Sequence, residues 1–118
     1  MHRLRGIVAL AALAASATAA AQAPACDRAC LTEYIDRYFA ALVANDAGAL
    51  PQASRARITD NGAEKRLAAT FWDGAAEVIW RFDIVNTNRG DTGTQTVIRN
   101  ADGSKTMHLL RLKVANGA

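Results

Sequence analysis

Apolar side chains between residues 31 and 43 recur with the spacing of one helix face, and this pattern constrains the fold more than any other feature. The apolar positions follow the i, i+3, i+4, i+7 rule: Leu31, Tyr34, Ile35, Tyr38, Phe39, Leu42 and Val43. Asp27 is a natural N-cap, because its carboxylate can accept from the free amides of the first turn. The helix is expected to end near residues 45–46, since Gly48 and Pro51 then break it. Such a helix needs a second layer that buries its apolar face.

After Pro51 the period changes to the alternation of β-strands, which predicts that second layer. Residues 77–86 alternate most clearly, with one face formed by Val78, Trp80, Phe82 and Ile84 and the other by Ile79, Arg81, Asp83 and Val85. One face is expected to be core and the other partly wet. Further strands are expected at 56–59, 94–100 and 105–114, turns at 60–62, 89–93 and 102–104, and a short helical turn or loop at 67–76. The predicted fold class is α+β, an antiparallel meander behind one helix.

The first residues are typical of a secretory signal peptide. Basic His2, Arg3 and Arg5 precede an apolar run, and Ala21-Gln22-Ala23 provides a small-x-small cleavage site. The apolar run is shorter than the roughly 20 residues that a membrane span needs. Residues 1–23 are therefore predicted to be removed on export to the periplasm or the medium, and residues 24–118 to fold as one domain without a membrane anchor.

Charge excludes one class of partner. The chain has 14 basic and 11 acidic residues, and two of the basic ones, Arg3 and Arg5, belong to the signal segment. The other charges alternate in sign without a basic block, which argues against nucleic acid or an anionic membrane as a partner. No metal and no cofactor is expected.

Cys26 and Cys30 are the only cysteines, and export would bring them to an oxidising compartment. Four residues rise by about 6 Å on a helix, which suits a disulfide if Cys26 lies just outside the first turn. The alternatives are an acylated Cys26, which Pro24-Ala25 disfavours, and a metal site, for which partner ligands are lacking.

Three stretches of the chain resemble the nuclear transport factor 2-like (SnoaL-like) superfamily, within it an exported branch of uncharacterised function. They are residues 37–50 at the helix exit, the turn at 58–62 and the strand end at 110–114. The resemblance implies a cone, in which a curved antiparallel sheet wraps over the N-terminal helix and encloses an apolar pocket. The family's fold has a further strand after the last turn, so the cone is expected to lack its last strand. Strand 105–114 would then form an open edge at which a second copy could bind.

Some members of this superfamily are ketosteroid isomerases, and their motif implies a candidate catalytic site. Tyr38 falls on the helix tyrosine, Asp60 on the aspartate base, and His108 on the second oxyanion donor, where the family has a carboxylic acid. Proton transfer next to a carbonyl needs such a base and such donors. Each residue also has a purely structural explanation: a packed aromatic, a turn aspartate and an inward core histidine.

The candidate ligand-binding residues are aromatic: Tyr34, Trp72, Trp80 and Phe82. The alternative for these aromatics is simple core filling, and Arg81 and Asp83 are expected to form a solvated pair. The sequence favours an exported domain that binds a small apolar molecule or a partner chain. The alternatives are an isomerase or lyase that acts by proton transfer, and a structural dimerisation module.

Overall fold

A computed structural model describes residues 26–115, and the predicted signal segment 1–23 lies outside this range. Its first element is the helix α1, Arg28–Val43, which confirms the predicted amphipathic helix. The Asp27 carboxylate caps it by accepting from the Cys30 amide at 2.9 Å. The chain leaves the helix through Asn45, whose φ of 52° is left-handed and which therefore ends the helical hydrogen bonding. The later elements are η1 Ala47–Ala49, β1 Thr59–Asp60, β2 Ala63–Glu64, η2 Leu67–Ala69, β3 Ala75–Asn86, β4 Asp91–Asn100 and β5 Lys105–Lys113.

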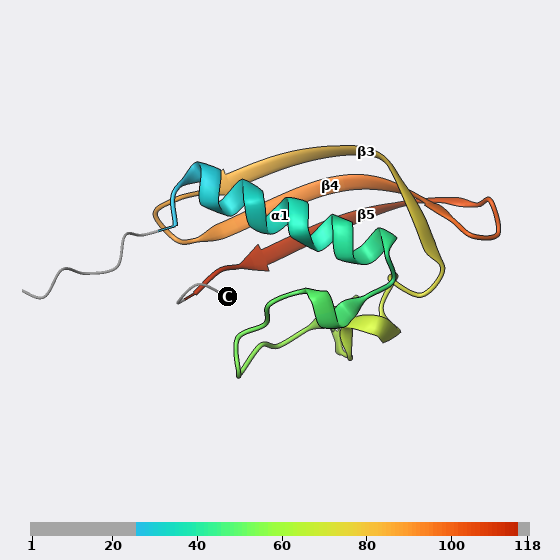
Figure 1. Ribbon diagram of the computed structural model, residues 1–118, viewed down its shortest axis with the longest axis horizontal. Helices are drawn as coiled ribbons and strands as arrows, with labels where there is room; N and C mark the ends of the chain where they lie inside the picture. Colours follow the sequence, from blue (N-terminus) through green and yellow to red (C-terminus); the bar gives the residue numbers. More distant parts are fainter. Residues whose placement is uncertain (1–25, 116–118) are drawn as a thin grey trace, which may run out of the picture.

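The three long strands form one antiparallel sheet in the order β3-β4-β5, which confirms the α+β class and the meander. Figure 1 shows α1 lying along one face of this sheet. The helix packs chiefly on β3, which leaves β5 at the other edge of the sheet. The cone and its absent last strand stay predictions of the resemblance.

The predicted turn at 60–62 connects β1 and β2, which form a small separate hairpin. Asn61 and Gly62 both have positive φ, at 49° and 81°, as a two-residue turn between paired strands requires. The turn pairs Asp60 with Ala63 and Thr59 with Glu64. The strand expected at 56–59 lies instead at Thr59–Asp60, so it begins three residues and ends one residue later than expected, because pairing in a tight hairpin begins immediately beside the turn.

The core lies between α1 and the sheet. The helix contributes the buried Ile35, Tyr38, Phe39 and Leu42, and β4 contributes Ile98. Each large apolar side chain that is fully buried stabilises a fold by about 1.5–3 kcal/mol. The helical spacing in the sequence places several of these side chains on one face of α1, and it therefore predicts the main packing contact of the domain. Other members of the core are Ala41, Leu67, Trp72 and Ala75.

The faces of β3 correct the expectation that Trp80 and Phe82 fill the core. Both lie on the side of the sheet away from α1 and are 48% and 55% exposed, while Arg81 and Asp83 lie on the helix side. A register shift between Val78 and Trp80 causes this arrangement. One extra residue in a strand exchanges the faces of everything that follows it, and sequence alternation does not reveal such a bulge.

Candidate functional site

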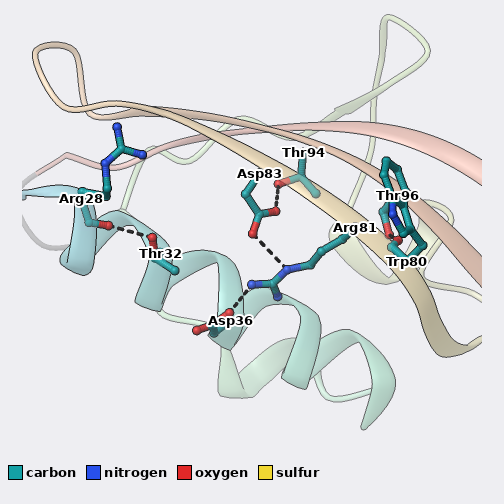
Figure 2. A network of polar contacts seen from close by, with 8 residues as sticks. All are labelled: Arg28, Thr32, Asp36, Trp80, Arg81, Asp83, Thr94 and Thr96. Carbon is teal, nitrogen blue, oxygen red and sulfur yellow. Dashed lines mark hydrogen bonds and ion pairs between the residues drawn. The ribbon is translucent and has the colours of Figure 1, made fainter.

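Arg81 is the centre of a polar network between the helix and the sheet (Figure 2). Its guanidinium donates to Asp83 at 3.0 Å and to Asp36 of α1, and it lies over the Phe39 ring, 5.3 Å from the centroid. Thr94 of β4 donates to the other oxygen of Asp83 at 2.9 Å. The side chains of Arg81 and Asp83 are only 26% and 22% exposed, so the expectation of a solvated pair is wrong. The pair attaches α1 to β3 instead.

Tyr38, the predicted helix donor, lies in the core. It is 3% exposed, and its hydroxyl oxygen accepts a hydrogen bond from Trp72 Nε1 at 2.8 Å. The two rings meet edge to face, with centroids 5.3 Å apart. Burial raises the pKa of Tyr38 to about 12, and the negative charge of Asp60 adds to the rise. Tyr38 therefore remains a neutral hydroxyl at physiological pH.

His108, the predicted second donor, lies on the helix side of β5 and stacks on Phe71. The ring centroids are 4.0 Å apart and the planes are inclined by 19°. His108 Nε2 and Thr106 Oγ1 are 2.9 Å apart, within hydrogen-bond distance. Burial lowers the pKa of His108, with partial opposition from the charge of Asp60. The imidazole is therefore favoured in its neutral form, which can both donate and accept.

Asp60, the predicted base, lies in β1 with its side chain 25% exposed and Lys65 Nζ at 3.6 Å. Its charge acts on the pKa of both Tyr38 and His108. The fold thus brings Tyr38 of α1 and His108 of the edge strand β5 within electrostatic reach of Asp60 in the short hairpin.

A pocket of about 440 Å³ lies beside this group. It is lined by Phe71, Asp73 and Gly74 and, from the β4–β5 hairpin, by residues 100–102, 106 and 108. Of the three predicted catalytic residues, His108 alone is among its lining residues. A second hollow of about 690 Å³ runs along α1 between Asp27 and Asp36. Within residues 26–115, the side chains that line this second hollow come from α1 and its N-cap, so no other described element provides an opposing wall.

The four predicted ligand-binding aromatics lie in three different places. Trp72 is buried in the core, Trp80 and Phe82 lie on the far side of the sheet, and Tyr34 lies on α1 with Arg37 over its ring at 5.8 Å. None of them lines either hollow. The aromatic that does line the pocket is Phe71, which the sequence interpretation treated only as loop packing. The adjacent Phe71-Trp72 pair is the sequence signal that could have identified Phe71. Neighbouring side chains point in different directions, so when Trp72 fills the core, Phe71 faces elsewhere.

The remaining features of the described chain are structural. Cys26 and Cys30 are joined by a disulfide, with Cα atoms 5.2 Å apart, immediately before and within the first turn of α1. Across residues 26–115, no three potential metal ligands gather at one place. In the same range, every helix is too short or too polar to span a bilayer.

Comparison with known proteins adds no family to these observations. No protein-family model, curated protein or solved structure matches the chain. Membership of the nuclear transport factor 2-like superfamily therefore remains a prediction based on the three short stretches.

Proposed function

We propose that this protein is a small exported domain that binds a small, largely apolar molecule in the pocket beside Phe71 and His108. The observation that carries the proposal is the stacked Phe71–His108 pair on the wall of a pocket of about 440 Å³. This volume lies within the range of about 300–1,000 Å³ that is usual for small-molecule sites. Export is supported by the signal-like residues 1–23, and sequencing the N-terminus of the secreted product would test it.

The lining favours a ligand with an apolar body and a hydrogen-bonding group. The Phe71 and His108 rings, with the small Gly74 and Ala101, present carbon surface to the pocket. Asp73 and Asp102 contribute carboxylates, which accept hydrogen bonds when ionised, and one oxygen of Asp102 already accepts from the amide and hydroxyl of Ser104. A planar or aliphatic molecule that carries an amine or a hydroxyl suits this combination.

Thermal stability measured against a library of such molecules tests the proposal. A ligand that binds only the folded state at 100 times its Kd stabilises it by about 2.7 kcal/mol. We expect the melting temperature to rise with at least one amine- or hydroxyl-bearing apolar compound. Absence of any hit in a broad library would refute small-molecule binding.

A matched pair of variants locates the binding site. Phe71→Leu keeps apolar packing but removes the stacked ring, so the ligand-induced rise should be lost. Phe82→Leu makes the same change on the opposite side of the sheet and should leave the rise intact. Equal effects of the two substitutions would show that the ligand does not bind in this pocket.

A second candidate, proton transfer next to a carbonyl, is favoured by the electrostatic convergence on Asp60. Asp60 would act as the base, and Tyr38 and His108 would donate to the developing oxyanion. The burial of Tyr38 and its hydrogen bond from Trp72 favour ligand binding over this alternative, because a substrate oxygen must reach the Tyr38 hydroxyl.

Proton exchange tests this second candidate. Exchange of solvent deuterium into the α-position of a β,γ-unsaturated ketone should be catalysed by the wild-type protein and abolished in Asp60→Asn. If exchange persists in Asp60→Asn, this carboxylate is not the base.

A further inference from the structure

The side of the sheet that faces away from α1 carries a largely apolar surface, which we call the outer face. The strand register arranges it in three rows across β3, β4 and β5. The rows are Trp80–Val97–Met107, Phe82–Gln95–Leu109 and Ile84–Gly93–Arg111.

The large apolar side chains of the outer face are unusually exposed to solvent. The exposed fractions are 48% for Trp80, 55% for Phe82, 61% for Ile84, 66% for Met107 and 83% for Leu109. Together these five side chains expose on the order of 700 Å² of mostly apolar surface, whereas a soluble monomer rarely exposes a contiguous patch of more than a few hundred Å². By contrast, the helix side of the same sheet carries the buried Thr92, Thr94 and Thr96. Apolar side chains are thus not confined to the covered side of the sheet, where Ile98 belongs to the core, because the outer face exposes large ones to solvent.

We infer that the outer face binds a second copy of this chain, face to face. A standard protein interface buries about 800 Å² on each partner, which the outer face supplies almost entirely by itself. The ion pair Glu77–Arg99 lies at one end of the apolar rows and Asp91–Arg111 at the other. An apolar centre with charged residues at its ends is the usual anatomy of a protein–protein interface.

The centre of the outer face favours a copy of itself over other occupants. Gln95 lies in the middle row between Phe82 and Leu109, and its amide donates to the Met107 sulfur at 3.3 Å, a weak acceptor. A residue that lies on the two-fold axis of a dimer meets its own copy, and an amide at that position carries both a donor and an acceptor for such a pairing. A lipid surface would leave this amide without partners, and burial of an unpaired amide is costly.

Gly93, in the third row, leaves space for the opposing copy. It has no side chain, and a Cβ added there would meet no atom within 4 Å. An apolar side chain of the second copy can therefore lie against the backbone of the central strand, beside Ile84. This mode differs from pairing at the open β5 edge, which the sequence offers as an alternative.

Sedimentation equilibrium of the purified protein from about 1 to 100 µM tests the inference. We expect the wild-type protein to be a dimer and Leu109→Lys to weaken association at least about tenfold, because a lysine would be buried without a partner. Val43→Lys is the matched control, since Val43 is an exposed apolar residue of α1 at 46% and lies outside the outer face. This control should remain dimeric.

Met107→Lys, on the same strand, provides a second variant if Leu109→Lys does not fold, as judged by circular dichroism. A wild-type protein that is monomeric at every concentration would overturn the inference. A dimer that survives both outer-face substitutions would also overturn it, and would indicate association through the β5 edge. The inference does not rest on the ligand pocket, because Phe71 and His108 lie on the opposite side of the sheet.

Discussion

Three threonines on the helix side of β4 provide a test in which one substitution should have opposite effects at neighbouring positions. Thr92, Thr94 and Thr96 are each at most 3% exposed. Thr94 donates to the Asp83 carboxylate at 2.9 Å, and Thr96 donates to the Trp80 carbonyl at 2.8 Å. Thr92 Oγ1 is the one buried side-chain polar atom in residues 26–115 without a hydrogen-bond partner.

Valine has nearly the shape of threonine, so each Thr→Val change isolates the hydroxyl group. At Thr92 the change removes an unsatisfied buried group and should raise the free energy of unfolding by about 1 kcal/mol. At Thr94 it removes a hydrogen bond to a carboxylate that is still partly solvated, and should cost about 1–2 kcal/mol. At Thr96 it removes the hydrogen bond to the Trp80 carbonyl beside the β-bulge, and should cost about 1 kcal/mol.

Urea denaturation followed by tryptophan fluorescence, with calorimetry as a check, would measure these differences. A change of 1 kcal/mol moves the melting temperature of a domain of this size by about 4–8 °C, which is well within resolution. The reasoning would be refuted if Thr92→Val destabilised the protein as much as Thr94→Val. That result would mean that the Thr92 hydroxyl has a partner in the folded protein.

Three further predictions concern ionisation and the disulfide. Because the pKa of Tyr38 is raised to about 12, the free energy of unfolding should fall as pH rises from about 10 towards 12. Tyr38→Phe should remove this pH-dependent loss. At neutral pH the same substitution should cost about 1–3 kcal/mol in urea unfolding, because it leaves the Trp72 N–H without its acceptor. Because burial lowers the pKa of His108 from 6.5, the unfolded chain binds a proton more readily, so stability should fall as pH drops below that value; urea midpoints of His108→Gln should lack this component. The double change Cys26→Ala and Cys30→Ala should cost at most about 2 kcal/mol of unfolding free energy, because the disulfide closes a short loop. Amide exchange should accelerate in the first turn of α1, and slower exchange there would show that the disulfide does not hold this turn in place.

The sequence predicted those parts of the candidate site that depend on residues close together in the chain, or that a resemblance supplied, and it missed the contacts between distant residues. Tyr38, Asp60 and His108 were chosen from a resemblance, and the fold brings them within electrostatic reach. The pocket residue Phe71 was missed, since its stacking on His108 joins positions 37 residues apart in the chain. No local pattern carries information about such a contact.

The sequence by itself determined the features whose hydrogen bonds close within a few residues. The cap at Asp27, the length of α1 and the turn at Asn61-Gly62 follow from side chains acting on neighbouring backbone. The order of the long strands follows from the short turns between them, because strands joined by a short turn pair with each other. Only the tertiary structure decided which face of the sheet met the helix. The bulge before Trp80 and the attachment of Arg81 to Asp36 turn the aromatic face outward. A strand's alternation is symmetric about its own axis, so the choice of face depends on what packs against it.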